Sequence, residues 1–123
     1  MYDYVLQYGF DTDTKNYIQS IKDYLKINNI NDEERNWLPH ITIDLYNCKN
    51  QQEFIDKVDN IVSKLNKFNL EFNNLNNFDK KTLYIEPYNK ELLMKNKSIF
   101  DCNLDCYRLE HRKQRLYRPH ATL

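Results

Sequence analysis

The chain of 123 residues lacks a net charge, because 18 basic residues balance 18 acidic ones. No global field therefore favours nucleic acid or a membrane surface, and any anion-binding site must be local. The sequence also lacks an apolar run near the roughly 18 to 20 residues that a membrane span needs. These absences predict a soluble protein with no membrane partner.

Cysteine is scarce and odd in number, with only Cys48, Cys102 and Cys106. Because no signal peptide is evident, we expect reduced thiols and a cytoplasmic location. Cys102, Cys106 and His111 resemble a metal-ligand spacing, but a zinc site needs a fourth ligand and tighter spacing. We therefore predict no metal and no cofactor.

Histidine and proline are rare as well, three of each, yet they occur together twice. The segments are WLPHITI at residues 37–43 and YRPHATL at residues 117–123. Both read aromatic, any residue, Pro, His, any residue, Thr, aliphatic. Chance alone gives a second Pro-His-x-Thr about 0.003 times in a chain of this composition. The repeat therefore needs a structural or functional cause.

Hydrophobic periodicity predicts a single α+β domain over residues 1–123. The expected order is β-α-β, α, β-β-α-β, with each Pro-His-x-Thr at the end of a β-α-β unit. A helical stripe of Tyr88, Leu92, Met94 and Ile99 marks the third helix. The predicted strands are 2–9, 38–46, 69–73, 81–86 and 117–123, the helices are 11–27, 51–67 and 88–100, and the loops or turns are 28–36, 73–80 and 103–116.

Strand geometry explains why histidine and threonine stand two residues apart. Side chains at i and i+2 of a strand point to the same face, about 6 to 7 Å apart. Each motif thus sets an imidazole, which can transfer a proton, beside a hydroxyl that can bind a phosphate oxygen. Two such pairs can place one histidine on each side of a phosphorus atom. Because the ordinary pKa of histidine is about 6.5, one base and one acid can coexist near neutral pH.

The two motifs, 80 residues apart, resemble the signature of the 2H (two-histidine) phosphoesterase superfamily, which includes 2'-5' RNA ligase-like and cyclic nucleotide phosphodiesterase proteins. The resemblance implies duplicated β-α-β lobes with antiparallel sheets forming a cleft, the first lobe carrying residues 40–42 and the second 120–122. It implies metal-independent chemistry on a 2',3'-cyclic phosphate or a 2'-5' phosphodiester of nucleotides or RNA ends. His40 and His120 would be the general acid and base, and Thr42 and Thr122 would bind the phosphate.

Family members usually continue for several strands after the second motif, whereas this chain stops at Leu123. The resemblance therefore implies either a C-terminal truncation or a sheet that a partner chain completes. Two further hypotheses follow: a non-catalytic RNA- or nucleotide-binding module with the same cleft, and an interaction protein that self-associates through its C-terminal strand.

Residues near the second motif add candidates for substrate contact. Four of the five arginines fall within residues 107–120, where the local charge is near +4. This cluster is either a solvated loop or a polyanion contact, with Arg118 and Arg115 as candidates. The aromatic rings of Trp37, Tyr117 and Tyr84 could stack on a base, although such rings are more often part of a core.

Overall fold

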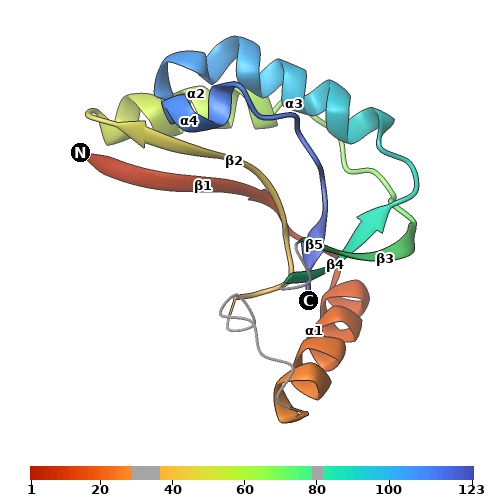
Figure 1. Cartoon of the computed structure of the whole chain (residues 1–123). Coiled ribbons are helices and arrows are strands. Elements are labelled where there is room, and N and C mark those ends of the chain that lie inside the picture. Colours follow the sequence, from red (N-terminus) through yellow and green to blue (C-terminus); the bar gives the residue numbers. More distant parts are fainter. Residues whose placement is uncertain (29–36, 79–81) are drawn as a thin grey trace. The chain divides into compact units, whose positions relative to one another are not determined.

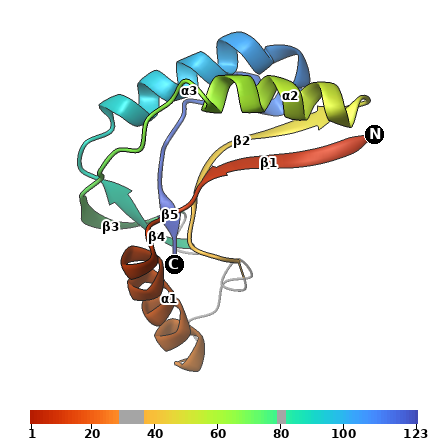
Figure 2. The same ribbon diagram turned by 180° about the vertical axis from the view of Figure 1, so that it is seen from behind.

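The computed structural model of the chain describes residues 1–28, 37–78 and 82–123. The fold is α+β, and its elements follow the predicted order, with two short helical turns before the last strand (Figures 1 and 2). The elements are β1 (Tyr2–Tyr8), α1 (Thr12–Ile27), β2 (Ile41–Cys48), α2 (Gln51–Val62), β3 (Phe72–Phe78), β4 (Thr82–Pro87), α3 (Glu91–Leu104), the 3-10 helix η2 (Asp105–Tyr107), α4 (Glu110–Lys113) and β5 (Ala121–Thr122). Most of the loop predicted at 28–36 lies outside the described residues.

The first of two compact units contains Met1–Leu6, Ile43–Leu70 and Asn89–Arg118. Strands β1 and β2 pair and run in opposite directions (Figure 1). Helices α2 and α3 lie along the same side of this pair in both views (Figures 1 and 2). Buried apolar side chains fill the unit: Tyr46, Cys48, Phe54, Ile61, Leu93, Phe100 and Leu104.

The second compact unit contains Gln7–Thr42, Glu71–Tyr88 and Pro119–Leu123. Its antiparallel sheet has the order β3-β4-β5, and β4 pairs with β5 through Tyr84 opposite Thr122 and Ile85 opposite Ala121. Ile18 and Leu25 of α1 form a core cluster with Leu123, against which Leu83 and Ile85 of β4 pack. The last residue of the chain is therefore part of this core.

Local sequence explains where the first two helices begin. The Asp11 side chain accepts from the backbone N–H of Thr14 at 3.0 Å, and Asn50 does the same for Glu53 at 3.0 Å. Each side chain satisfies an amide that has no partner within its own helix. Helix α2 ends at Val62, five residues before the predicted end, in a turn where Lys64 and Leu65 donate to Ile61 and Val62.

The predicted first strand of the hairpin, 69–73, was wrong in its bounds. Strand β3 covers Phe72–Phe78, so it takes in most of the segment predicted as a turn. Asparagine has little intrinsic preference for strands, and a local prediction therefore favours a turn here. Pairing with β4 from Phe72–Pro87 to Phe78–Thr82 overrides that preference.

The predicted third helix and the following loop were also misplaced. Helix α3 runs from Glu91 to Leu104, and its buried face is Leu93, Asn96, Lys97, Phe100 and Leu104 rather than the apolar stripe of the prediction. Two members of that face are polar, which hides its 3.6-residue period from a hydrophobicity pattern. Within the segment 103–116, predicted as a loop, the chain forms η2 and α4.

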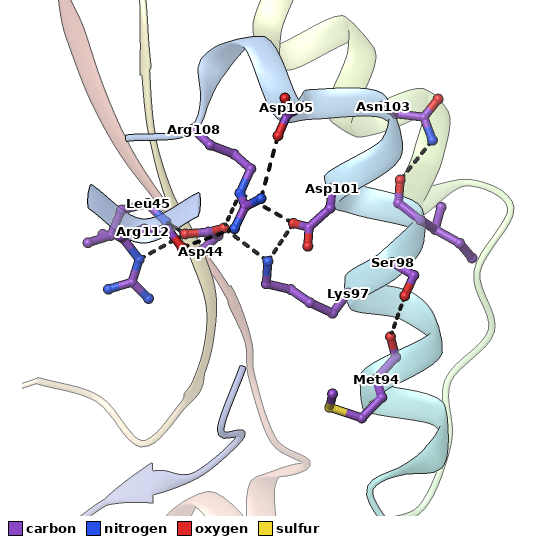
Figure 3. Close-up of polar contacts among 11 residues, drawn as sticks. Asp44, Leu45, Met94, Lys97, Ser98, Asp101, Asn103, Asp105, Arg108 and Arg112 are labelled. Carbon is purple, nitrogen blue, oxygen red and sulfur yellow. Dashed lines mark hydrogen bonds and ion pairs between the residues drawn. The ribbon is translucent and has the colours of Figure 1, made fainter. Parts of the chain in front are cut away.

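Lys97 is buried because it faces a buried acid on β2 (Figure 3). Asp44 is 1% exposed, and its Oδ2 accepts from Lys97 Nζ at 3.0 Å and from Arg108 Nε at 2.8 Å. Its Oδ1 accepts from Arg112 Nε at 2.8 Å and from the Leu45 N–H at 2.8 Å. The carboxylate thus ties β2 to α3, to the residue that follows η2, and to α4 within the first unit.

Two further carboxylates balance the cations around Asp44. Asp101 contacts both Lys97 and Arg108, and Asp105 lies 3.5 Å from Arg108. Burial alone would raise the pKa of Asp44, but the Leu45 N–H, Lys97 and Arg112 outweigh it, and the pKa of Asp44 is lowered. We call this group the Asp44 cluster: Asp44, Lys97, Asp101, Asp105, Arg108 and Arg112.

Replacing Asp44 by Asn should destabilise the protein by about 3–5 kcal/mol, because it leaves buried cations without their partner. Urea unfolding followed by circular dichroism measures the change. The control is Glu110→Gln, which removes an acid whose side chain is 87% exposed and should change the free energy of unfolding by less than about 0.5 kcal/mol. Equal effects of the two substitutions would contradict a structural role for the cluster.

The stability that Asp44 contributes should depend on pH. Its folded-state pKa lies below the unfolded value of about 3.9, so the contribution is complete above that pH and is lost as the pH falls through the folded-state pKa. Unfolding free energies of the original chain and of Asp44→Asn, measured from pH 7 to pH 2.5, should converge at the acidic end. A difference that stays constant over this range would refute the linkage.

Candidate two-histidine site

The first motif lies where the chain enters β2. Pro39 is buried and His40 is half-buried, and β2 begins at the next residue. Ile41 is 0% exposed and Ile43 is 3% exposed, whereas Thr42 between them is half-buried. Alternation therefore directs His40 and Thr42 to the face opposite the buried isoleucines.

In the second motif, at the entry to β5, the proline and the residues after the histidine and after the threonine are buried as in the first, whereas the threonine itself is more deeply buried than Thr42. Pro119 is buried, His120 is half-buried, and Ala121 and Leu123 are 0% and 3% exposed. Thr122 is 8% exposed and stands opposite Tyr84 of β4. Because Pro39–Thr42 and Pro119–Leu123 fall in the same compact unit, both His-x-Thr pairs belong to one body of the structure.

A backbone hydrogen bond determines which nitrogen of neutral His40 carries the proton. Its Nδ1 lies 2.7 Å from the carbonyl oxygen of Leu38. A carbonyl can only accept, so Nδ1 must be the donor, and the lone pair of the neutral ring is on Nε2. The ring also lies 6.0 Å from the Trp37 ring at an interplanar angle of 32°. His40 therefore has a fixed tautomer with Nε2 as its proton acceptor.

Two aromatic rings pack against the histidine of the second motif. The His120 ring lies 5.0 Å from Phe78 of β3 and 5.0 Å from Tyr84 of β4, measured between centroids. Tyr84 is 1% exposed, so its ring belongs to the packed interior and does not offer an open face to a base. The segment containing Phe78 reads locally as a turn, and this contact is therefore visible only once the β3–β4 register is known.

The residues predicted to contact a nucleotide are distributed over both units. Trp37 shares the unit of the two motifs and is 53% exposed. Arg115, Tyr117 and Arg118 belong to the other unit, where the two arginines are exposed and Lys97 Nζ lies 5.5 Å from the Tyr117 ring. Their roles toward a substrate stay predictions.

The basic segment 108–118 is divided between structural and exposed cations. Arg108 and Arg112 bind the buried Asp44, and Lys113 pairs with Glu110 at 2.9 Å. Asp44 was absent from the predicted site residues, although an acid between the apolar residues Ile43 and Leu45 of a strand is a signal that could have identified it. The positive charge of this segment that can contact a ligand is thus smaller than the value near +4 counted from the sequence.

The cysteines do not form a cross-link in this structure. Cys48 is buried, while Cys102 and Cys106 are exposed, and all three are free. Within residues 1–28, 37–78 and 82–123, no three or more His, Cys, Asp or Glu side chains are placed to hold a metal ion. In the same ranges no helix is long and apolar enough to cross a membrane.

The α+β order of elements and the two His-x-Thr segments at strand entries are consistent with the fold of a 2H phosphoesterase. Sequence comparison gives the family: the model of the 2'-5' RNA ligase superfamily matches residues 10–123. The chain therefore belongs to the 2'-5' RNA ligase superfamily, within the 2H phosphoesterases. No curated protein and no solved structure matches the chain.

The hydrogen bond to Leu38 predicts the Nδ1–H tautomer for neutral His40. Nitrogen-15 NMR of the imidazoles at pH 8 should show a protonated Nδ1 and an unprotonated Nε2 for this residue. A His40→Ala variant assigns the signals, which is practical in a chain with three histidines. The opposite tautomer would contradict this geometry.

Proposed function

We propose that this protein is a metal-independent phosphoesterase that acts on 2',3'-cyclic phosphates or 2'-5' phosphodiesters of nucleotides or RNA ends. The observation that carries the proposal is the pair of His-x-Thr segments in the same compact unit, each with a half-buried histidine and with buried residues after the histidine and after the threonine. Membership in the 2'-5' RNA ligase superfamily supports the same class of substrate.

In the proposed reaction, water attacks phosphorus in line with the oxygen that leaves. One histidine, in its neutral form, accepts the proton from water as the new P–O bond forms. The other, in its protonated form, donates a proton to the 2' or 3' oxygen as the old P–O bond breaks. The product of a cyclic phosphate is a phosphomonoester with one free hydroxyl, and each histidine ends in the state opposite to the one in which it started.

The threonines would hold the phosphate during this exchange. A hydroxyl donates a hydrogen bond to a non-bridging oxygen without adding charge, and such a donor stabilises the negative charge that grows in the transition state. Thr42 and Thr122 each stand two residues after a histidine, on the same face of the strand. Both are thus suited to a phosphate that lies between the two imidazoles.

Contacts beyond the phosphate would come from the exposed candidates. Trp37 could stack on a base, as aromatic residues do in single-strand RNA recognition. Arg115 and Arg118 are exposed and could contact further phosphates of an RNA end; Tyr117 is the remaining candidate. We propose these four as secondary contacts, subordinate to the motif residues.

His40→Ala and His120→Ala should each lower kcat/KM for a 2',3'-cyclic nucleotide by about 10²- to 10⁴-fold, the usual contribution of a general acid or base. Turnover is measured by chromatography in the presence of EDTA. The matched control is His111→Ala, which removes the only histidine outside the motifs, an exposed residue of α4.

Full activity of either His40→Ala or His120→Ala would contradict the proposed mechanism. Saturable binding of the cyclic nucleotide by the original chain without any product would instead favour a non-catalytic nucleotide- or RNA-binding module. Salt titration of that binding would then report how many phosphates the protein contacts.

A further inference from the structure

The register of β3, β4 and β5 shows which residues lie on each face of the sheet in the second unit. Residues that stand opposite one another on paired strands point to the same side, so Asn76, Tyr84 and Thr122 share a face. The opposite face presents Leu83, Ile85 and Leu123 to the α1 core. Phe78 and His120 stand two residues from Asn76 and Thr122, which places them on the Thr122 face by alternation.

Three rings meet on that face. Phe78 and Tyr84 are stacked, with centroids 4.1 Å apart and an interplanar angle of 26°. The His120 ring is 5.0 Å from each of them, at 77° to Phe78 and 58° to Tyr84. The imidazole therefore packs against a pair of rings that are already packed against each other.

We propose that Phe78 and Tyr84 are positioning residues that hold the His120 imidazole in its reactive orientation. The expected effect on kcat rests on the proposed function. The packing of the two rings against His120 does not depend on it. Neither ring is assigned a contact with the substrate. We call the Phe78–Tyr84 pair the aromatic shelf.

The need for such a shelf follows from the side-chain torsions of histidine. The terminal torsion has broad, roughly two-fold preferences, and a half-turn of the ring exchanges the positions of carbon and nitrogen atoms. His40 is held against this motion by its hydrogen bond to the Leu38 carbonyl. For His120, two ring contacts at different angles restrict the orientation of the ring plane by packing.

Loss of the shelf should affect the reaction step more than substrate binding. A displacement of about 1 Å in a reacting group can cost about 10²-fold in rate. If Phe78 instead stacked on a base, its removal would raise KM and leave kcat unchanged. The division of the effect between kcat and KM therefore separates the two roles.

The test uses the full chain with Phe78→Leu, Phe78→Tyr as the conservative variant, and Leu75→Ala as the control. Leu75 is 66% exposed, lies on the same strand, and belongs to the other face of the sheet by alternation. We expect Phe78→Leu to lower kcat by about 10- to 100-fold with KM within about twofold. Phe78→Tyr should recover kcat to within about threefold, and Leu75→Ala should leave it unchanged.

Proton NMR without substrate provides a readout that does not depend on activity. In the original chain, the His120 ring protons should show NOEs to Phe78 and Tyr84, with assignment by His120→Ala. Absence of these NOEs overturns the shelf even if every variant folds. Unchanged kcat in folded Phe78→Leu, or a rise in KM alone, also overturns it. Observed NOEs with no turnover in the original chain would support the shelf and refute the proposed function.

Discussion

The candidate site depends on the burial of one residue in each motif. Ile41 stands between His40 and Thr42, Ala121 stands between His120 and Thr122, and both are 0% exposed. Because side chains in a strand alternate, burial of the middle residue fixes the histidine and the threonine on the other face. The following residues, Ile43 and Leu123, are buried too and reinforce this choice. The hydrophobic core thus orients the histidine and threonine side chains. A one-residue slip in the register of either strand would turn these side chains to the opposite face of the sheet.

The Asp44 cluster serves a different purpose further along β2. Its carboxylate lies two residues after Thr42 in sequence, is 2% exposed as a side chain, and joins the strand to Lys97, Arg108 and Arg112. A buried acid is costly by itself, and it is tolerated here because four hydrogen bonds satisfy its oxygens. The cluster also changes the electrostatic picture, since two arginines from the most basic segment of the sequence neutralise an acid and are unavailable to a polyanion.

Much of the fold could be predicted from the sequence, and the candidate site proposed from it, because the signals are local. The order of elements follows from hydrophobic periods. Each Pro-His-x-Thr segment marks a strand, but β2 is Ile41–Cys48 rather than 38–46, and β5 is only Ala121–Thr122 rather than 117–123. Other features could not be predicted, because they depend on partners far away in the chain. Arg108 binds Asp44, which is 64 residues away in the sequence. Lys97 lies on the buried face of α3 because its partner is on β2, and a hydrophobicity pattern does not reveal a buried lysine. The Asn-rich segment β3 is a strand because β4 pairs with it. The aromatic neighbours of His120 come from that same pairing.

The most direct test of the central claim follows the oxygen atom that the reaction should add to phosphorus. The full chain is incubated with an RNA oligonucleotide ending in a 2',3'-cyclic phosphate, in water enriched in oxygen-18 and with EDTA present, and the product is weighed by mass spectrometry. Two-histidine hydrolysis predicts a terminal phosphomonoester that carries one oxygen-18 atom, and no such product from a His40→Ala/His120→Ala chain. An unchanged cyclic end after incubation with folded protein, or equal labelling by the double variant, would contradict the account.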